Sequence, residues 1–463
     1  MRYIEIHVGF DDVDSPSGGC TTHYASLLLA KWVKRGLELI DYPNLTRLNP
    51  GVPWKTRGNG SVVIRARVES EDRAKDLFEE ALSFIYEYLG AYSEDWKKYS
   101  QPAVAMYVGE VEDRIKWFGS KALYDIVPIS LLELLLDKVR GRLYYSIPGS
   151  GKRGLIGAIA GIGNRMLRGD YTYELVAYRS PDYIGSERKV SKESIIAMDK
   201  LYGRDTILNY DYETDRPLIM PHGPDPVLLG IRGEEPDILL KAFSKLDIYE
   251  PVPLAVVYRT NQHTDQHLKP INNLKEAYPY RSIKIYAQVS TKPRRILGGH
   301  VLFKITDGSD EIDVAAYQPT GGFRDIVEML EPGDLVEVMG VIRPPSSRHG
   351  RTLNLEKIHV VMAKPKIVLE NPKCPKCGAR MKSMGRNKGF KCPKCGFKSK
   401  SATKIKRVVK RSLEPGWYEP PPRAFKHLMK PIKRFGREKE GFPKIYRPGT
   451  VVLVEGRSLS IRS

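Results

Sequence analysis

Residues 4–32 read IEIHVGFDDVDSPSGGCTTHYASLLLAKW and join a strand pattern to a helix pattern through an acidic loop. The apolar residues of 4–10 predict a strand. The apolar periodicity that begins at residue 23 predicts a helix, whose start Thr21 or Thr22 could cap. A strand, a turn and a helix in this order open an α/β or α+β domain.

The segments that follow keep alternating between strand and helix patterns, which extends the α/β or α+β reading along the chain. Further on, a strand–helix–strand unit forms a fragment of a ferredoxin-like pattern. The predicted strands are 61–68, 103–110, 171–179, 226–233 and 253–260, and the predicted helices are 71–89, the end of the glycine-rich segment 149–167, and 237–246.

The acidic loop places Asp11, Asp12 and Asp14 at the end of the first strand. Like charges this close repel by roughly 1 kcal/mol per pair or more unless a cation or water screens them. Carboxylates at a strand end are suited to Mg²⁺, which takes one or two of them together with phosphate oxygens. A solvated turn is the plain alternative. The loop also resembles the Asp-x-Asp-x-Thr/Val phosphatase signature, but Ser15 holds its fourth position and no partner motif follows.

The next residues, Gly18-Gly19-Cys20-Thr21-Thr22, lead into the start of the predicted helix. A helix N-terminus is an anion site, so this stretch is a candidate for binding the phosphates of a nucleotide together with Ser15. A threonine hydroxyl here could receive a phosphoryl group, or it could only cap the helix. Cys20 is better explained as a packed thiol than as a nucleophile.

The segment PGSGKRGLIGA, residues 148–158, is a second phosphate candidate. Its glycines, Gly151 among them, free the backbone, and Lys152 and Arg153 supply positive charge. The spacing does not fit a Walker A loop. Tight packing of a glycine-rich helix is the structural alternative.

Two central loops, 220–235 and 258–268, are rich in polar residues. His263 and His267 stand at i and i+4, the spacing of a possible metal pair, but their surroundings predict a loop. A carboxylate in such loops could hold a small cationic molecule.

From residue 280 the pattern changes to five short alternating strands, with a helix at 323–330 between the third and the fourth. This order predicts an OB-fold, whose surface suits single-stranded nucleic acid. Another small β-barrel is the alternative.

Cys374, Cys377, Cys392 and Cys395 form two CxxC pairs with a 14-residue spacer. Four thiolates complete a tetrahedral Zn²⁺ site with no open position, so the motif predicts a structural zinc ribbon. A pair of disulfides is the alternative, and a cytosolic protein disfavours it.

Charge is concentrated at the C-terminal end. Residues 363–463 hold 28 of the 75 Lys and Arg but 6 of the 55 Asp and Glu, a net charge of +22, while the rest of the chain is at −2. Such a patch is the footprint of a polyanion binder, although a solubilising tail would look similar. The tail's aromatic residues could contact RNA or anchor the tail to its own domain; they are Trp417, Tyr418, Phe425 and Phe435.

No apolar run approaches the length of a membrane span, and the N-terminus resembles a strand rather than a signal peptide. These features predict a cytoplasmic protein without a membrane partner.

Taken together and in order, these stretches resemble the archaeal tRNA-isoleucine 2-agmatinylcytidine synthetases, the TiaS family. The resemblance spans nearly the whole chain. It is carried by FDDVDSPSGGCTT, NPGVPWKTRGNG, GKRGLIGAIAGIG, NYDYETDRPLIMPHGPDPVLLGIRG, YRTNQHTDQHL, the OB segment, the CPKC pair and RAFKHLMKPIKR. The family motif reads DDTDS where this chain has DDVDS, which leaves the carboxylates in place and affects only Val13.

The resemblance implies an ATP-dependent ligase that acts on the isoleucine tRNA with anticodon CAU. ATP phosphorylates the C2 carbonyl oxygen of the wobble cytidine, and the amine of agmatine then replaces the phosphate at C2. The modified base pairs with A, so the tRNA decodes AUA. The resemblance implies ATP and Mg²⁺ beside the structural Zn²⁺.

The resemblance also implies roles for individual residues. Asp11, Asp12 and Asp14 would hold Mg²⁺–ATP, and Thr21 would be autophosphorylated. Ser15, Gly18, Gly19, Thr22, Gly151, Lys152 and Arg153 are the candidate ATP contacts. Agmatine is a dication, and Asp225 and then Asp265 are the candidate carboxylates for it.

The expected architecture is a multidomain α+β chain. It comprises a kinase-like ATP- and cytidine-activating α/β domain (1–190), a ferredoxin-like domain (191–275), an OB-fold (276–362), a zinc ribbon (363–400) and a basic tRNA-binding segment (401–463). The competing interpretations are a non-enzymatic single-strand-binding protein, which leaves the first 270 residues without a role, and a simple nucleotide kinase, which has no need of the basic tail.

Overall fold

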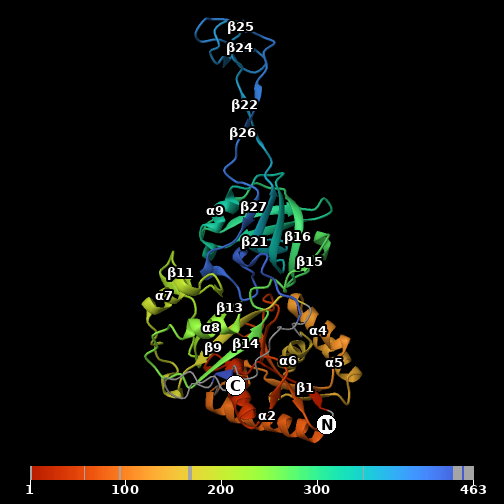
Figure 1. Cartoon of the computed structure of the whole chain (residues 1–463). Helices are drawn as coiled ribbons and strands as arrows, with labels where there is room; N and C mark the ends of the chain where they lie inside the picture. The colour runs from red at the N-terminus through yellow and green to blue at the C-terminus, as the bar shows by residue number, and fades with distance from the viewer. Residues whose placement is uncertain are drawn as a thin grey trace.

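The structure is a computed structural model that describes residues 3–56, 58–92, 95–164, 169–347, 349–441 and the backbone of 451–452. Figure 1 shows a broad α/β body, a barrel above it, and a small ribbon at the end of a two-stranded stalk. The chain visits these parts in that order and then returns past the barrel to the α/β body.

A single 11-stranded sheet runs through the α/β body in the order β10-β13-β9-β14-β5-β6-β1-β7-β8. Its neighbours pair antiparallel except β14 and β5, which are parallel and join the two halves of the sheet. The bounds are β1 (Ile4–Asp11), β4 (Glu38–Leu39, beside β6), β5 (Asn44–Arg47), β6 (Gly60–Val68), β7 (Ala103–Val108), β8 (Leu143–Ser146), β9 (Thr172–Tyr178), β10 (Thr206–Ile207), β13 (Val227–Gly233), β14 (Leu254–Thr260) and β28 (Val451–Val452, beside β14).

Helices cover both faces of this sheet. Ile6, Val8 and Phe10 alternate along β1 and pack under α1 (Thr21–Lys34) and α2 (Glu71–Tyr92). The opposite face carries α4 (Asp113–Tyr124), α5 (Ile129–Lys138) and α6 (Arg153–Gly163). The helices α7 (Lys192–Tyr202) and α8 (Pro236–Phe243) pack on β9, β13 and β14. Short elements fill the connections: β2 (Asp14–Ser15), β3 (Gly18–Gly19), α3 (Trp96–Tyr99), η1 (Pro181–Tyr183), β11 (Tyr210–Asp211) and β12 (Arg216–Pro217).

The capping of α1 differs from the sequence expectation. The helix begins at Thr21 itself, so both threonines lie in its first turn, and the N-cap residue is Cys20, which makes no side-chain capping bond. The β2–β3 hairpin folds the acidic loop back over the helix start. The Thr21 hydroxyl therefore accepts a hydrogen bond from the Val13 amide, 3.1 Å away, instead of capping its own helix.

The expected domain boundary at residue 190 follows β9 in the sequence. In the sheet, β9 lies between β13 and β14, two strands from beyond that boundary. The domain limits remain predictions, while the sheet itself is continuous across them.

The barrel has the five strands and the helix expected of an OB-fold. It consists of β16 (Ser282–Val289), β18 (Val301–Thr306), β19 (Glu311–Ala316), β20 (Leu335–Arg343) and β21 (Thr352–Met362), and the β16–β18 pairing closes it. The helix α9 (Phe323–Glu328) stands between β19 and β20, as predicted. Smaller pieces flank it: β15 (Lys269–Pro270), η2 (Leu274–Glu276), β17 (Arg294–Arg295) and η3 (Gln318–Thr320).

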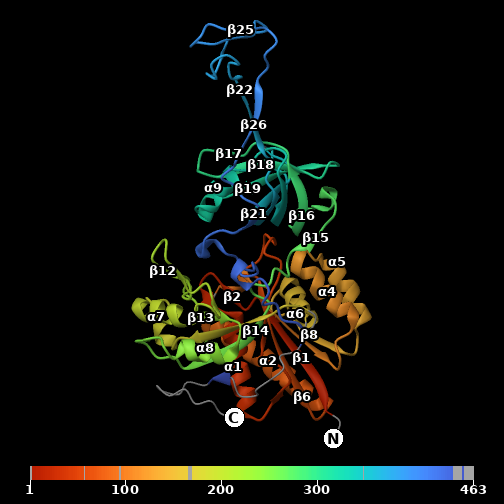
Figure 2. The same cartoon turned by 45° about the horizontal axis from the view of Figure 1, so that its top comes forward.

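The stalk consists of β22 (Lys366–Glu370) paired with β26 (Ile405–Val409), and it carries the ribbon away from the barrel (Figure 2). The ribbon contains β23 (Lys382–Ser383), β24 (Phe390–Lys391) and β25 (Lys398–Ser399). After the stalk, residues 416–441, here called the strap, return to the α/β body. The strap includes β27 (Gly416–Tyr418, beside β21), η4 (Pro422–Ala424) and η5 (Ile432–Arg434).

Within the described residues, every helix is too short or too polar to cross a membrane.

Candidate functional site

The acidic loop begins where the central strand β1 ends. The helix α6 crosses the sheet beside this end and turns a face of small residues toward it. A Cβ on Gly157 would lie 1.5 Å from Oδ2 of Asp11, so only glycine leaves room for that carboxylate. Gly154 and Gly161 are also too close to the neighbouring strands to carry a side chain. The glycines of this helix therefore allow it to pack tightly against its neighbours. Gly157 also leaves space for the Asp11 carboxylate.

Asp11 and Asp12 stand where burial disfavours an ionised carboxylate. Burial, together with repulsion from Asp12, raises the pKa of Asp11 well above its usual value. Burial also raises the pKa of Asp12, although the amide of Gln101 (2.6 Å) and the hydroxyl of Thr56 (2.9 Å) donate to it. No Lys or Arg of the described chain lies within ion-pair distance of either carboxylate, although the charge of Arg153 also lowers the pKa of Asp12. A bound cation would supply the missing positive charge.

Asp12 has a backbone φ of 60°, in the left-handed region that aspartate tolerates better than most residues. This turn sends the chain from β1 into the β2–β3 hairpin. Asp14 is buried, and its backbone carbonyl accepts a hydrogen bond from Ser100. The loop thus has a fixed conformation, which a solvated turn would not need.

Two cavities meet at the acidic loop. The first, here called the side cavity, has a volume of about 80 Å³ and lies between β1, the start of α6 and the loop after β5. Asp11, Asp12 and Thr56 line one side of it, and Arg153 and Lys55 also line it. The guanidinium of Arg153 stacks 4.8 Å from the ring centre of Trp54.

The second, here called the inner cavity, has a volume of about 290 Å³ and lies between the two halves of the sheet. Asp11, Asp14 and Thr21 face it from the front of the chain. Glu174 on β9 and Asp225 before β13 face it from the other half. Because Asp11 lines both cavities, groups bound in the two would meet at this carboxylate.

Glu174 is a site residue that the sequence interpretation did not select. It is 4% exposed and accepts hydrogen bonds on both oxygens, from Nε of Arg232 (3.0 Å) and from the side-chain amide of Gln262. The available signal was a single acidic residue inside the otherwise uncharged, largely apolar stretch YTYELVAY, because a buried strand retains a carboxylate only when it is paired.

The two candidate agmatine carboxylates end in different places. Asp225 lines the inner cavity and is held by Arg188 (3.2 Å) and the amide of Val227 (3.1 Å). Asp265 does not line that cavity. It pairs with Lys357 of the barrel and accepts a hydrogen bond from the amide of Lys430 in the strap, which is a structural connection.

The candidate ATP contacts also lie in different places, because some of them line a cavity and the others do not. Arg153 lines the side cavity and Thr22 the inner cavity. Lys152 pairs with Glu133, 2.7 Å away, outside both cavities. Gly151 packs against Gln101, and Ser15 with the two glycines of the β2–β3 hairpin, Gly18 and Gly19, lines neither cavity.

The loop after β14 binds the strap and holds no metal site. Nδ1 of His263 donates to the carbonyl of Met429 (3.0 Å), and Nε2 of His267 contacts Glu356 of the barrel (2.8 Å). The imidazoles thus have separate partners, as the loop interpretation requires.

A third hollow, here called the basic chamber, opens beside both cavities. Its volume is about 600 Å³, and none of the described residues that line it is acidic. Burial, followed by repulsion from Lys426 and Arg343, lowers the pKa of Lys55 there. Arg47 and His427 line both the basic chamber and the inner cavity. A polyanion entering the chamber would relieve the repulsion among these cations.

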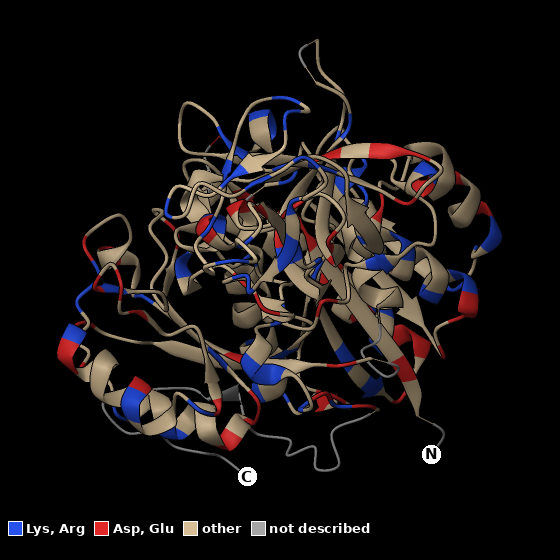
Figure 3. Cartoon of the chain, turned by 90° about the horizontal axis from the view of Figure 1, so that it is seen from above, with Lys and Arg blue, Asp and Glu red and all other residues tan. Residues whose placement is uncertain are grey.

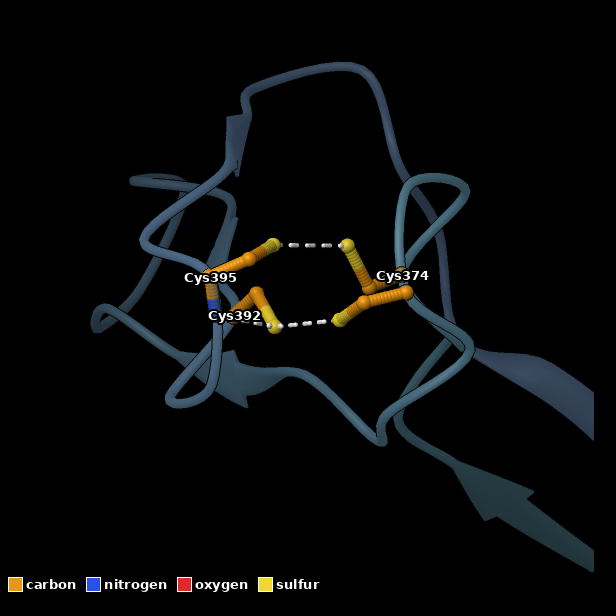
Figure 4. A group of neighbouring side chains, drawn as sticks. Cys374, Cys392 and Cys395 are labelled. Atoms are coloured by element: carbon orange, nitrogen blue, oxygen red, sulfur yellow. Dashed lines mark hydrogen bonds between the residues drawn. The ribbon is translucent and has the colours of Figure 1, made fainter.

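The four ribbon cysteines lie together, as the spacing predicted. All four sulfur atoms are within 4.8 Å of one another, with Cys374–Cys395 at 3.5 Å and Cys377–Cys392 at 3.4 Å (Figure 4). Zn–S bonds of about 2.3 Å in a tetrahedron separate sulfurs by roughly 3.8 Å, so the cluster fits zinc. The cysteines are unpaired by disulfides.

Two of the tail's aromatic residues anchor the strap. Trp417 stacks on His359 of the barrel with ring centres 4.5 Å apart, and Phe435 meets Trp417 edge-on at 5.1 Å. Phe425 lines the basic chamber. The described part of residues 363–463 thus divides into the ribbon on its stalk and an anchored strap. Residues 442–450 and 453–463 lie outside the described residues.

Family models match four stretches of the chain. They are the TiaS TCKD domain at residues 7–139, the TiaS FLD domain at 152–267, the OB-fold nucleic acid binding domain at 283–361 and the TiaS C-terminal zinc ribbon domain at 371–413.

Proteins named TiaS match this chain over nearly its full length. The isoleucine-tRNA 2-agmatinylcytidine synthetase TiaS of Staphylothermus marinus is 58% identical over 454 residues, 98% of each chain. A crystal structure of a TiaS complex with its isoleucine tRNA and ATP matches with a TM-score of 0.81 and 35% identity, over 96% of this chain and all of that one. A TiaS complex with the same tRNA, AMPCPP and agmatine matches with a TM-score of 0.79 and 33% identity, over 95% and 100%.

Proposed function

Because this chain belongs to the TiaS family, we propose that it is an ATP-dependent ligase that joins agmatine to C2 of the wobble cytidine in the CAU-anticodon isoleucine tRNA. ATP activates the C2 carbonyl oxygen by phosphorylation, and the amine of agmatine replaces the phosphate. The relatives are named for this product, and two similar structures hold the isoleucine tRNA with ATP or with AMPCPP and agmatine. We assign the reaction to the cytoplasm, where tRNA and ATP are found.

One observation carries the proposal. In the inner cavity, Asp11, Asp14 and Thr21 from the TCKD half face Glu174 and Asp225 from the FLD half. The first group suits phosphoryl transfer, since carboxylates and a hydroxyl stand at a helix N-terminus. The second group supplies the negative charge that a dicationic amine requires. A cytidine between them would meet the activating and the attacking partner in one place.

We assign the nucleotide phosphates to the side cavity. There Arg153 and Lys55 supply positive charge, and Asp11 and Asp12 lack an ion-pair partner in the described chain. These two carboxylates, with Asp14, would hold Mg²⁺, which offsets the charge of the triphosphate. Thr21 lies on the inner-cavity side with its oxygen fixed by the Val13 amide, an orientation that suits a phosphoryl acceptor.

We assign the RNA strand to the basic chamber. The wobble cytidine must leave its stack to reach the inner cavity, at a cost of a few kcal/mol. Contacts from Lys and Arg to phosphates on either side of that base would offset the cost. The chamber opens between the TCKD loop, the OB barrel and the strap, so all three would hold the same strand. The ribbon and its stalk would bind another part of the tRNA.

The test is conjugation of labelled agmatine to a CAU-anticodon isoleucine tRNA transcript in Mg²⁺–ATP. We expect label in the RNA that disappears with Asp12→Ala and with a changed wobble base. Binding of any single strand without incorporation would contradict the proposal and support the single-strand-binding protein. ATP turnover on free nucleotides without tRNA would instead support the simple kinase.

A further inference from the structure

One histidine of the strap enters the site from the far end of the chain. His427 lines both the inner cavity and the basic chamber. Its position is fixed by the backbone, because its carbonyl accepts from the amide of His263 at 2.8 Å, and the next carbonyl, of Leu428, accepts from the amide of Asp265 at 2.8 Å. The strap therefore runs beside the loop after β14 like an added strand segment, with His427 directed at the cavity.

A chain of hydrogen bonds sets the protonation of this imidazole. Nδ1 of His427 lies 2.9 Å from Oε1 of Gln262, whose side-chain amide donates to Glu174. Since the amide nitrogen of Gln262 faces a carboxylate, its oxygen faces His427, and Nδ1 must carry the hydrogen. Nε2 is then the nitrogen with a free lone pair.

Nε2 makes no hydrogen bond to the part of the chain that the structure describes. A Cβ on Gly58 would lie 2.5 Å from a terminal nitrogen of Arg47 and 2.9 Å from Nε2 of His427, so the loop before β6 leaves room for both groups by having no side chain there. The carboxylates of the inner cavity differ in this respect. Both oxygens of Glu174 accept hydrogen bonds, and Asp225 is paired with Arg188.

The attack of agmatine on cytidine releases protons. The ammonium group gives one to solvent water and becomes the nucleophilic amine. As the nitrogen–C2 bond forms, the nitrogen becomes positively charged and loses a second, while the C2–O2 bond breaks and phosphate leaves with O2 and the electron pair of that bond. We propose that Nε2 of His427 accepts the second proton, and that Gln262 and Glu174 are the positioning residues that aim it. This inference rests on the proposed function and adds a proton acceptor to it.

The surrounding charges and burial favour the neutral imidazole, the form that can accept a proton. The positive charge of Arg47, followed by burial, lowers the pKa of His427 well below its usual value, so the ring is neutral at physiological pH. An amine nitrogen bonded to an electron-poor carbon is far more acidic than free agmatine, so a weak base suffices. Among the described residues, the charged and titratable groups that act on the ring are Arg47, Arg232, His263 and Lys55. Glu174 lies behind Gln262, and Lys426 and Arg343 line the basic chamber beside the ring.

The test is the pH profile of single-turnover conjugation in full-length protein with Mg²⁺–ATP and tRNA. His427→Asn keeps a donor where Nδ1 stands and removes Nε2. We expect its rate at pH 7 to fall by about 100-fold or more, with little change in the KM for agmatine, and to recover as pH rises and hydroxide takes the proton. His427→Ala should be rescued by added imidazole. His222→Asn, the same change at an exposed histidine, is the matched control.

Three results would overturn the inference. They are an unchanged rate in His427→Asn, a loss of equal size at every pH, and a failure of imidazole to rescue His427→Ala when its melting temperature and tRNA affinity are normal. The last two would leave His427 with a structural role. Absence of agmatine incorporation by the wild-type chain itself is a separate result, because it removes the proposed function and this inference with it.

Discussion

At the scale of single residues, the site depends on Asp11, a carboxylate whose ionised form is disfavoured by burial. Asp11 ends a strand that is covered on both faces, and Gly157 gives it space without giving it a partner. Evolution of a stable fold alone would place an amide or an apolar residue there. The presence of a carboxyl group here therefore indicates a function, since a cation bound during the reaction would favour its ionised form.

Asp11→Asn tests whether burial of the ionised Asp11 carboxylate destabilises the folded protein. A carboxyl whose pKa is raised in the folded state favours folding below its unfolded pKa, near 4, and that contribution is lost as pH rises through the folded pKa. We expect the variant and the wild type to be equally stable near pH 4 in EDTA. At pH 8 the variant should be more stable by about 1–3 kcal/mol, although it should not conjugate agmatine. Denaturation at both pH values measures this, and a stability difference independent of pH would contradict it.

At the scale of elements, the strap connects the barrel, the inner cavity and the α/β body. It adds β27 to the barrel, contributes His427 to the inner cavity, and is fastened to the α/β body by Arg434. This arginine is fully buried, with Asp170 at 2.8 Å, Glu234 at 2.6 Å and the carbonyl of His263 at 2.6 Å. A short irregular segment can hold a site residue in place because such contacts replace a regular hydrogen-bond ladder.

Arg434→Met should loosen the strap. It leaves Asp170 and Glu234 with Lys430 (3.7 Å) and Lys439 (3.2 Å) as their cationic partners among the described residues. Breaking a buried ion pair costs up to about 3–5 kcal/mol. Arg437→Met is the matched control, because Arg437 pairs with Asp205 at the surface, where a pair contributes about 1 kcal/mol or less. Urea denaturation compares the two, and limited proteolysis should cut the strap only in Arg434→Met. Equal stability losses would show that the strap is held by other contacts.

At the scale of the whole molecule, the ribbon is separated from the chemistry. Figure 3 looks down on this end of the protein and colours its charged residues. Residues 371–404 contain 11 Lys and Arg and no acidic residue, and they pack around their own small core. Two strands connect them to the barrel, where Arg411 binds both carboxylate oxygens of Asp334. This arrangement suits a basic module that grips RNA at a distance from the modified base.

Replacing residues 371–404 by an Asn-Gly turn should close the stalk as a hairpin. We expect the melting temperature of the remaining protein to change little and its zinc to be lost. Affinity for tRNA should fall, and each lost phosphate contact should reduce the slope of log K against log salt by about 0.7–0.9. Filter binding at several salt concentrations checks this. Chelation of zinc from the full-length chain should produce the same affinity loss, and unchanged affinity in both would exclude the ribbon from the RNA interface.

Local features of the sequence determined most of the elements. Most strands of the α/β body, its helices α1, α2, α6 and α8, and the OB order follow from short-range periodicity, whereas α4, α5 and α7 were not predicted. The zinc ligands follow from spacing within one short segment. The motif order also identified the family. These features share one property, since each depends on residues close together in the chain.

The tertiary structure decided how those elements build a site. The parallel β14–β5 pair joins the two halves of the sheet, and this junction brings Glu174 and Asp225 opposite Asp11 and Thr21. It also separated Asp265 from Asp225, although both stood in similar polar loops. His427 reaches the cavity from more than 400 residues away from Asp11 in the chain. A sequence records no such distances, because long-range packing, and not local preference, sets which side chains meet.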